Sequence, residues 1–144
     1  MAIGLEAYDD AVLRFHVNKG FNLKTWHAAV ERLRKNKLRV KTYLMFKPPF
    51  MSEGDALIHS VRWIQEVSRL SDEVSINPMN IQKRTIVDRL HRNREYRPPW
   101  LWSLVKMIQD SHNAVKESGC RVIVHPTAGG KIRGAHNCGK CDKE

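Results

Sequence analysis

Apolar residues recur along this chain with two different spacings, which separate its expected helices from its expected strands. Short runs of β-branched and apolar residues predict strands at residues 2–5, 39–46, 73–77 and 121–124. Apolar residues three or four positions apart, together with capping residues, predict helices at residues 9–17, 22–36, 52–67, 85–93 and 100–117. Because strands and helices alternate, we expect an α/β fold with parallel strands and right-handed crossovers.

The same pattern predicts one folded unit that is open at its edges. No internal repeat or linker splits the 144 residues, which suffice for one core. We assign residues 1–118 to the main unit and residues 119–144 to a short strand with a polar, Gly-rich tail. Three consecutive units predict a curved half-sheet with unpaired backbone groups at both edges. Since the first strand begins at residue 2 without a lead-in, we expect a preceding part of the fold to be missing.

Charge adds an expected partner to this picture. The net charge is +10 and the pI is near 9.9, which favours an anionic partner, most commonly nucleic acid, although general solubility is an alternative reading. No apolar run is long enough to span a bilayer. The N-terminal residues do not form a secretory signal. We therefore expect a cytoplasmic protein with no membrane partner.

Residues 75–102 combine hydrogen-bonding, cationic and aromatic side chains. Arginine forks bind phosphate and aromatic rings stack on bases, so this stretch predicts a wall that binds RNA or another polyanion. Its candidate residues are Asn80, Gln82, Lys83, Arg84, Arg92, Arg94, Tyr96 and Arg97. The plain alternative is a strand end, a solvated helix and two core tryptophans; we expect at least one of Trp100 and Trp102 in the core.

Polar residues also follow the predicted strands. Functional sites of parallel α/β sheets lie at the carboxyl ends of the strands, which here carry Glu6, Lys47 and Asn77. One carboxylate, one amine and one amide would then meet on the same rim. The alternatives are a surface acid, a rim lysine and a turn-forming asparagine before proline. Phosphate-binding loops, zinc-protease motifs and the serine-hydrolase elbow are absent from the sequence.

The C-terminal segment contains potential metal ligands. Cys138 and Cys141 form a C-x-x-C pair, and His125 and His136 bring the set to four, which is the number that zinc takes. With Cys120 the chain has three cysteines, too few for a disulfide framework. Two alternatives stay open, a flexible tail with unligated thiols and a metal site completed by residues outside this sequence.

Several motifs resemble a known enzyme family. The run Ile3-Gly4-Leu5-Glu6, followed by Asp9-Asp10 and Asn18-Lys19-Gly20-Phe21, resembles the fourth strand and following helix of radical S-adenosylmethionine enzymes. The segments KTYLMFKPPF, SINPMNIQK, YRPPWLWS and HNCGKCD resemble more closely the archaeal radical enzyme of archaeosine biosynthesis, a relative of the elongator catalytic subunit. The resemblance covers nearly the whole chain. It implies the C-terminal half of a partial (βα)6 TIM-like radical barrel, with strands four to six, and a Cys/His-containing tail.

The resemblance also implies a reaction and its participants. Members of the family act on tRNA and, with a lysine-transferring partner, convert a lysine-bearing 7-deazaguanine in the D-loop to archaeosine. The implied cofactors are S-adenosylmethionine and a [4Fe–4S] cluster. The positions implied to lie around the cofactor are Glu6, Lys47, Ser75 and Asn77.

One departure from the family limits this expectation. The cluster is held by a C-x-x-x-C-x-x-C loop, and this sequence contains no such triplet. We therefore expect a fragment or split subunit of a radical enzyme, inactive until the missing N-terminal half is supplied. The alternative is a non-catalytic, basic tRNA-binding module.

Overall fold

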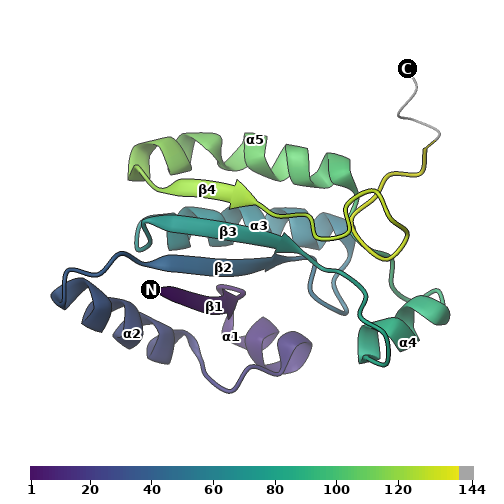
Figure 1. Cartoon of the computed structure of the whole chain (residues 1–144), viewed down its shortest axis with the longest axis horizontal. Helices are drawn as coiled ribbons and strands as arrows, with labels where there is room; N and C mark the ends of the chain where they lie inside the picture. The colour runs from purple at the N-terminus through teal and green to yellow at the C-terminus, as the bar shows by residue number, and fades with distance from the viewer. Residues whose placement is uncertain (140–144) are drawn as a thin grey trace.

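In the computed structural model, which describes residues 1–139, the strands form one parallel sheet in the order β1-β2-β3-β4 (Figure 1). The strands are β1 (Ala2–Glu6), β2 (Lys41–Phe46), β3 (Glu73–Pro78) and β4 (Arg121–Val124). Right-handed crossovers between neighbouring parallel strands place their helices on one face of the sheet. The expected α/β class with a parallel sheet is thus confirmed, whereas the partial barrel stays a prediction.

The long helices follow the predicted positions closely. They are α2 (Leu23–Lys35), α3 (Glu53–Ser68) and α5 (Leu101–Ser118). Side chains cap two of them, because Asn22 Oδ1 accepts from the Thr25 amide at 3.1 Å and Ser52 Oγ accepts from the Asp55 amide at 3.1 Å. Gly119 ends α5 with a φ of 67°, a conformation that glycine adopts without a steric penalty.

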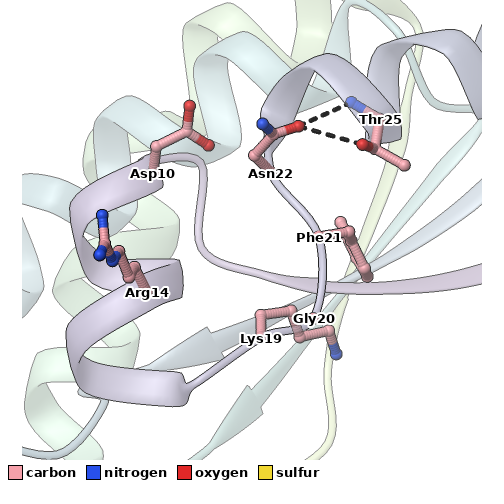
Figure 2. Close-up of a pocket in the computed structure, with 7 residues that line it drawn as sticks. All are labelled: Asp10, Arg14, Lys19, Gly20, Phe21, Asn22 and Thr25. Carbon is pink, nitrogen blue, oxygen red and sulfur yellow. Dashed lines mark hydrogen bonds between the residues drawn. The ribbon is translucent and has the colours of Figure 1, made fainter.

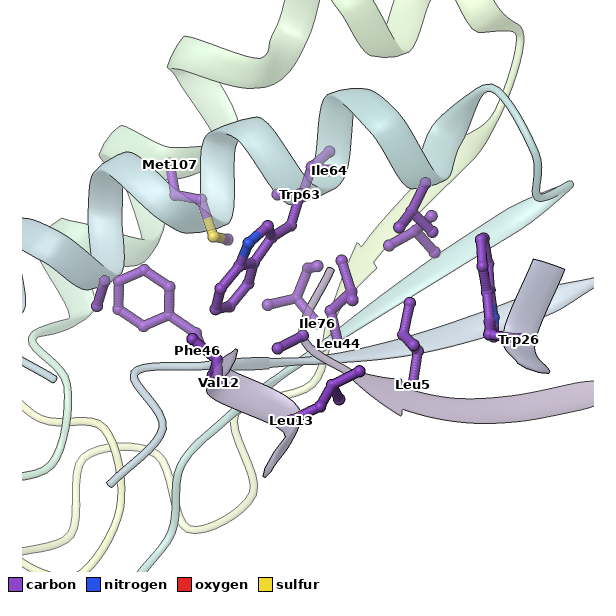
Figure 3. Close-up of a cluster of buried hydrophobic side chains, with 14 of the residues drawn as sticks. Leu5, Val12, Leu13, Trp26, Leu44, Phe46, Trp63, Ile64, Ile76 and Met107 are labelled. Carbon is purple, nitrogen blue, oxygen red and sulfur yellow. The ribbon is translucent and has the colours of Figure 1, made fainter. Parts of the chain in front are cut away.

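The main hydrophobic core lies between these helices and the sheet. Figure 3 shows Trp26 and Trp63 projecting from α2 and α3 toward the strand residues Leu5 and Leu44. All four are at most 2% exposed. Fully burying a large apolar side chain contributes about 1.5–3 kcal/mol, so this layer is the main source of the fold's stability.

The opposite face of the sheet carries different side chains. Successive strand residues point to opposite faces. Since Leu44 and Ile76 belong to the core, Tyr43, Ser75 and Asn77 point the other way. The long helices all pack on the core face, so this second face has no helix layer of its own. A parallel sheet with both faces covered reads as a continuous apolar run, and this alternation instead indicates a face left for a ligand or for another part of a protein.

Two elements differ from their predicted form. The expected helix at residues 9–17 is one turn of α-helix, α1 (Asp10–Val12), followed by a π-helix, η1 (Leu13–Val17), because the chain closes a wider turn before Asn18 enters the left-handed conformation. The third strand, expected to end at Asn77, includes Pro78. Proline is tolerated as the last residue of the strand, where its missing N–H removes no further ladder bond.

The segment after Pro126, expected to be a loop or tail, has no regular secondary structure but is packed against the body of the protein. His136 donates its amide to the Pro99 carbonyl at 3.1 Å, and Ala135 is only 1% exposed. In Figure 1 this loop lies beside α4 (Ile86–Arg92), beyond the carboxyl ends of the strands. It therefore helps to build the end of the sheet where the candidate site residues gather.

Candidate functional site

The predicted rim forms at the carboxyl ends of adjacent strands. Glu6 ends β1, Lys47 follows β2, and Asn77 lies at the end of β3, paired in register with Met45. Glu6 and Lys47 both have left-handed backbones, with φ values of 77° and 58°. Such conformations cost about 1–3 kcal/mol in residues other than glycine and tend to occur at functional sites. Two adjacent strand ends thus carry backbone strain at positions that the sequence singled out.

Glu6 is held by a lysine that sequence reasoning did not select. Lys19 Nζ forms an ion pair with Glu6 Oε1 at 3.1 Å. Lys19 also lines a pocket of about 480 Å³ beside the start of α2, together with Asp10, Arg14 and the turn that leads to Asn22 (Figure 2). The turn is well fixed, since Asp10 Oδ1 accepts from the Leu23 amide at 2.7 Å. The pairing orients the Glu6 carboxylate, and the resemblance gave no signal for it.

Lys47 is enclosed in a network that fastens a distant segment to the sheet. Its Nζ forms an ion pair with Glu53 Oε2 at 2.8 Å and donates to the Arg97 carbonyl at 2.8 Å. Tyr96 Oη donates in return to the Lys47 carbonyl at 2.8 Å. Lys47 is 6% exposed. This geometry gives Lys47 a tethering role, and the cofactor contact implied by the resemblance stays a prediction.

Ser75 and Asn77 lie on the face of the sheet that has no helix layer. Ser75 is fully buried, and its Oγ has no hydrogen-bond partner among residues 1–139. Leaving a buried hydroxyl unsatisfied costs about 1–3 kcal/mol, so such a group calls for an explanation. Asn77 is half-buried one pleat further along. The two side chains offer hydrogen-bonding groups to whatever occupies this face.

The predicted RNA-binding residues fall into two groups. Five are exposed: Gln82, Lys83, Arg84, Arg92 and Arg94. Asn80 and Arg97 are half-buried, and Arg97 donates to the His136 carbonyl at 3.0 Å. Tyr96 is 6% exposed, and burial, assisted by the Glu53 charge, raises its pKa above the usual range. The base-stacking role expected of Tyr96 does not fit this position, because its ring is covered.

Neither of the two nearby tryptophans is in the core, which corrects the sequence-based expectation. Trp100 is half-buried, and the Arg97 guanidinium lies 3.3 Å from the centre of its ring. Trp102 is 59% exposed. The core positions belong instead to Trp26 and Trp63. Trp100 opens α5, and its amide donates to Glu53 Oε1 at 2.9 Å, so tertiary contacts rather than apolar periodicity determine its place.

Sequence reasoning missed a second basic segment at this rim. Ile81 and Arg133 exchange hydrogen bonds: the Ile81 amide donates to the Arg133 carbonyl at 2.8 Å, and Arg133 Nε donates to the Ile81 carbonyl at 3.0 Å. Arg133 also donates to Asp88 Oδ1 at 2.7 Å, a bond that holds the pKa of Asp88 below its usual value. The cations of GGKIRG could have been found from their place after the last strand.

The predicted zinc ligands do not gather into a site within the described part of the chain. No group of three His, Cys, Asp or Glu side chains in residues 1–139 is arranged to hold a metal ion. His136 Nδ1 lies 2.8 Å from the Gly134 carbonyl, a contact that fixes its ring locally. Cys141 lies outside the described residues. Zinc at His125, His136, Cys138 and Cys141 therefore stays a prediction.

The third cysteine is expected to be chemically inert near neutral pH. Cys120 is 7% exposed, and burial raises the pKa of its thiol to about 11. Since only the thiolate is alkylated, its reaction with iodoacetamide should accelerate about tenfold per pH unit until that pKa is reached. Peptide mass spectrometry at pH 8 should show the exposed Cys138 modified well before Cys120. Equal rates for the two in the folded protein would contradict this burial; unfolding in urea should equalise them.

Comparisons with known proteins follow the same direction. No protein-family model matches the chain. The chain is 38% identical over 144 residues to a Methanosarcina acetivorans protein named archaeosine synthase subunit beta, covering all of this chain and 41% of that protein. It is 39% identical over 138 residues to the Thermococcus kodakarensis protein of the same name, covering 96% of this chain and 42% of that one. The chain thus spans about two fifths of the length of these relatives.

A solved structure shows a similar fold. Elp3 of Methanocaldococcus infernus, with an N-terminal deletion, superposes with a TM-score of 0.74 over 92% of this chain and 31% of that one, at 15% sequence identity. No described helix is both long and apolar enough to cross a membrane. The chain is therefore similar in sequence to part of the proteins named archaeosine synthase subunit beta, and similar in fold to part of Elp3.

Proposed function

We propose that this chain forms part of a radical S-adenosylmethionine enzyme that modifies tRNA in the formation of archaeosine. The observation that supports this most is the 38–39% identity, along nearly the whole chain, to two proteins named archaeosine synthase subunit beta. The fold shared with Elp3 agrees with it at the level of architecture. The motifs YRPPWLWS and HNCGKCD lie within the matched region and resemble the same enzyme.

The chain's own residues fit a polar cofactor on the sheet face that has no helix layer. Ser75 Oγ is buried there without a partner among the described residues, and the Asn77 amide lies beside it. Glu6, oriented by Lys19, provides a carboxylate at the same rim. These groups would hold S-adenosylmethionine, which, beside a [4Fe–4S] cluster, supplies radical chemistry. The sequence lacks the cysteine triplet of the family, so the cluster ligands would come from residues outside it.

The proposed substrate is tRNA bearing a lysine-modified 7-deazaguanine. The proposed partners are the N-terminal half or split subunit that carries the cluster loop, and the lysine-transferring enzyme of the pathway. The word "subunit" in the names of both relatives agrees with a partnered enzyme. In this assembly the residues of this chain would contribute one wall of the site, made of polar groups at the ends of β1 and β3.

Reconstitution tests this proposal. The chain, mixed with a partner that carries a loaded cluster loop, should cleave S-adenosylmethionine reductively, and Ser75→Ala with Asn77→Ala should weaken cofactor binding. Isothermal titration gives the affinity and chromatography gives the cleavage product. A stable, cluster-loaded complex that never cleaves the cofactor would contradict the enzymatic reading.

A second candidate function is a non-catalytic tRNA-binding module, which the exposed basic residues favour. Lys83, Arg84, Arg92 and Arg94 are all solvent-exposed at the carboxyl end of the sheet. If these four side chains contact phosphates, a plot of log K against log salt should have a slope of about −3. Fluorescence anisotropy with labelled tRNA between ~50 and ~200 mM salt measures this slope.

A matched control separates specific contacts from net charge. The variant Lys24→Gln with Arg32→Gln removes two exposed cations from α2, at the opposite end of the molecule from α4 (Figure 1). Its slope should stay near the wild-type value, whereas Lys83→Gln with Arg84→Gln should make the slope less steep by about 1.4. Affinity that ignores salt in the wild-type chain would exclude tRNA binding through this rim.

A further inference from the structure

The loop that follows β4 builds one wall of a basic pocket. Residues 80–83 form the other wall, and the two walls enclose about 810 Å³. They are joined at their base by the reciprocal hydrogen bonds between Ile81 and Arg133. The segments are about fifty residues apart in sequence, so only the fold brings them together. We call this cavity the loop pocket.

The lining of the loop pocket is selective in its chemistry. Its exposed cations are Lys83 and Lys131, and neither has an ion-pair partner within residues 1–139. Asn80 and Gln82 add two amides, and no carboxylate lines the pocket. A negatively charged ligand would therefore gain two cations without meeting a repelling charge. The amides can each donate and accept hydrogen bonds, as the edges of nucleobases do.

An apolar side chain completes the lining. Ile132 is 70% exposed although it stands between Lys131 and Arg133. Its position is fixed from both sides, since Arg133 is bonded to Ile81 and Asp88, and the Lys131 amide donates to the Ala128 carbonyl at 3.1 Å. An exposed isoleucine on a fixed loop, next to cations and amides, offers a flat apolar contact of the kind that an unstacked base can cover.

We propose that the loop pocket binds one unpaired nucleotide of the RNA substrate. Its phosphate lies on Lys83 and Lys131, and its base lies on Ile132 within reach of Asn80 and Gln82. Arg133 is a positioning residue, because its guanidinium is already bonded to Asp88 Oδ1 at 2.7 Å and holds the loop in place. This inference rests on the proposed tRNA substrate and names a contact that the modified base itself does not require.

The test compares single-stranded with paired RNA. Anisotropy titrations use a labelled unstructured oligonucleotide and a fully paired hairpin of equal length, with a polyglutamate peptide as competitor. Ile132→Ser should weaken binding of the unpaired RNA about fivefold, near the low end of base stacking, and leave the hairpin unaffected. Ile58→Ser is the matched control, because Ile58 is equally exposed at 70% and lies on α3.

The cations are tested in the same assay. Lys83→Gln with Lys131→Gln should make the salt slope for unpaired RNA less steep by about 1.4, whereas Lys24→Gln with Arg32→Gln should not. Steep, salt-dependent binding that none of the pocket variants alters would overturn the loop pocket and leave the proposed function intact. Displacement of RNA by polyglutamate at equal charge would overturn it in favour of an acidic protein. A wild-type chain without salt-dependent tRNA binding would overturn both.

Discussion

Replacing Gly134 with alanine is expected to detach the loop of residues 126–136 and to abolish the loop pocket. A Cβ at this position would lie 2.2 Å from the Ala128 carbonyl oxygen and 2.7 Å from its carbonyl carbon. Both atoms belong to the backbone, so the clash cannot be relieved by rotating a side chain. Overpacking of this kind costs about 1–3 kcal/mol. The loop should yield before the core, because its contacts with the body are few in comparison.

Amide hydrogen exchange measures this loss. The amides of Gly130 and His136 donate within and from the loop to the carbonyls of Ala135 and Pro99. Their exchange should accelerate roughly 5- to 150-fold, corresponding to that range of free energy. Gly20→Ala is the control, since nothing lies within 4 Å of the added Cβ and its φ is not positive. Unchanged protection in Gly134→Ala would show that the loop does not cross Ala128 as described.

Replacing Lys47 with methionine should destabilise the whole fold. The substitution keeps the length of the side chain but leaves the Glu53 carboxylate without its counter-ion at 2.8 Å. Breaking a buried pair by removing one partner costs about 3–5 kcal/mol, and we expect the lower end because the Glu53 side chain is 24% exposed. The Arg97 carbonyl also loses a donor, so the segment that leads to Trp100 should loosen.

Urea denaturation measures this effect, and a second substitution tests its cause. Lys47→Met with Glu53→Gln removes the stranded charge while its side-chain carbonyl can still accept from the Trp100 amide, so the double variant should be more stable than Lys47→Met alone. Lys35→Met breaks the exposed Lys35–Glu31 pair and should change stability by less than about 0.5 kcal/mol. A single variant at Lys47 as stable as this control would refute the tethering role.

The sequence predicted the order of elements because each element has a local signal. The apolar spacing of α2, the caps Asn22 and Ser52, and the β-branched run in β2 all act over a few residues. The parallel arrangement then followed from alternation alone. The π-helix η1 was missed because its wider turn leaves the apolar spacing of residues 13–17 almost unchanged. The extension of β3 to Pro78 depended on a partner strand, which local sequence does not reveal.

The candidate site was predicted only as far as strand ends locate it. Glu6, Lys47 and Asn77 do share the carboxyl edge of the sheet. The burial of Tyr96 against Lys47 joins positions 49 residues apart, and the bond from Arg133 to Asp88 joins positions 45 apart. Such contacts have no periodicity, so a cluster of cations and aromatics in sequence could not show which side chains would be tied down and which exposed. The loop pocket therefore became visible only in the structure.

The uncovered polar face and the loop pocket together describe one wall of a larger site. Ser75 and Asn77 lie on the face, and Lys83 and Lys131 lie beyond the ends of the strands. In this account the wall binds the cofactor at the sheet and the RNA at the rim. The cluster that supplies the radical chemistry lies on the other side, contributed by residues that this sequence does not contain.

A segment exchange tests this central claim most directly. The chain replaces its matched segment, 41% of the length, in the Methanosarcina acetivorans protein named archaeosine synthase subunit beta, in cells that lack the native gene. Mass spectrometry of digested tRNA then measures archaeosine. Our account predicts that the exchanged protein restores archaeosine and that the same exchange with Ser75→Ala and Asn77→Ala does not. A stable exchanged protein whose tRNA accumulates only the unconverted 7-deazaguanine would contradict it.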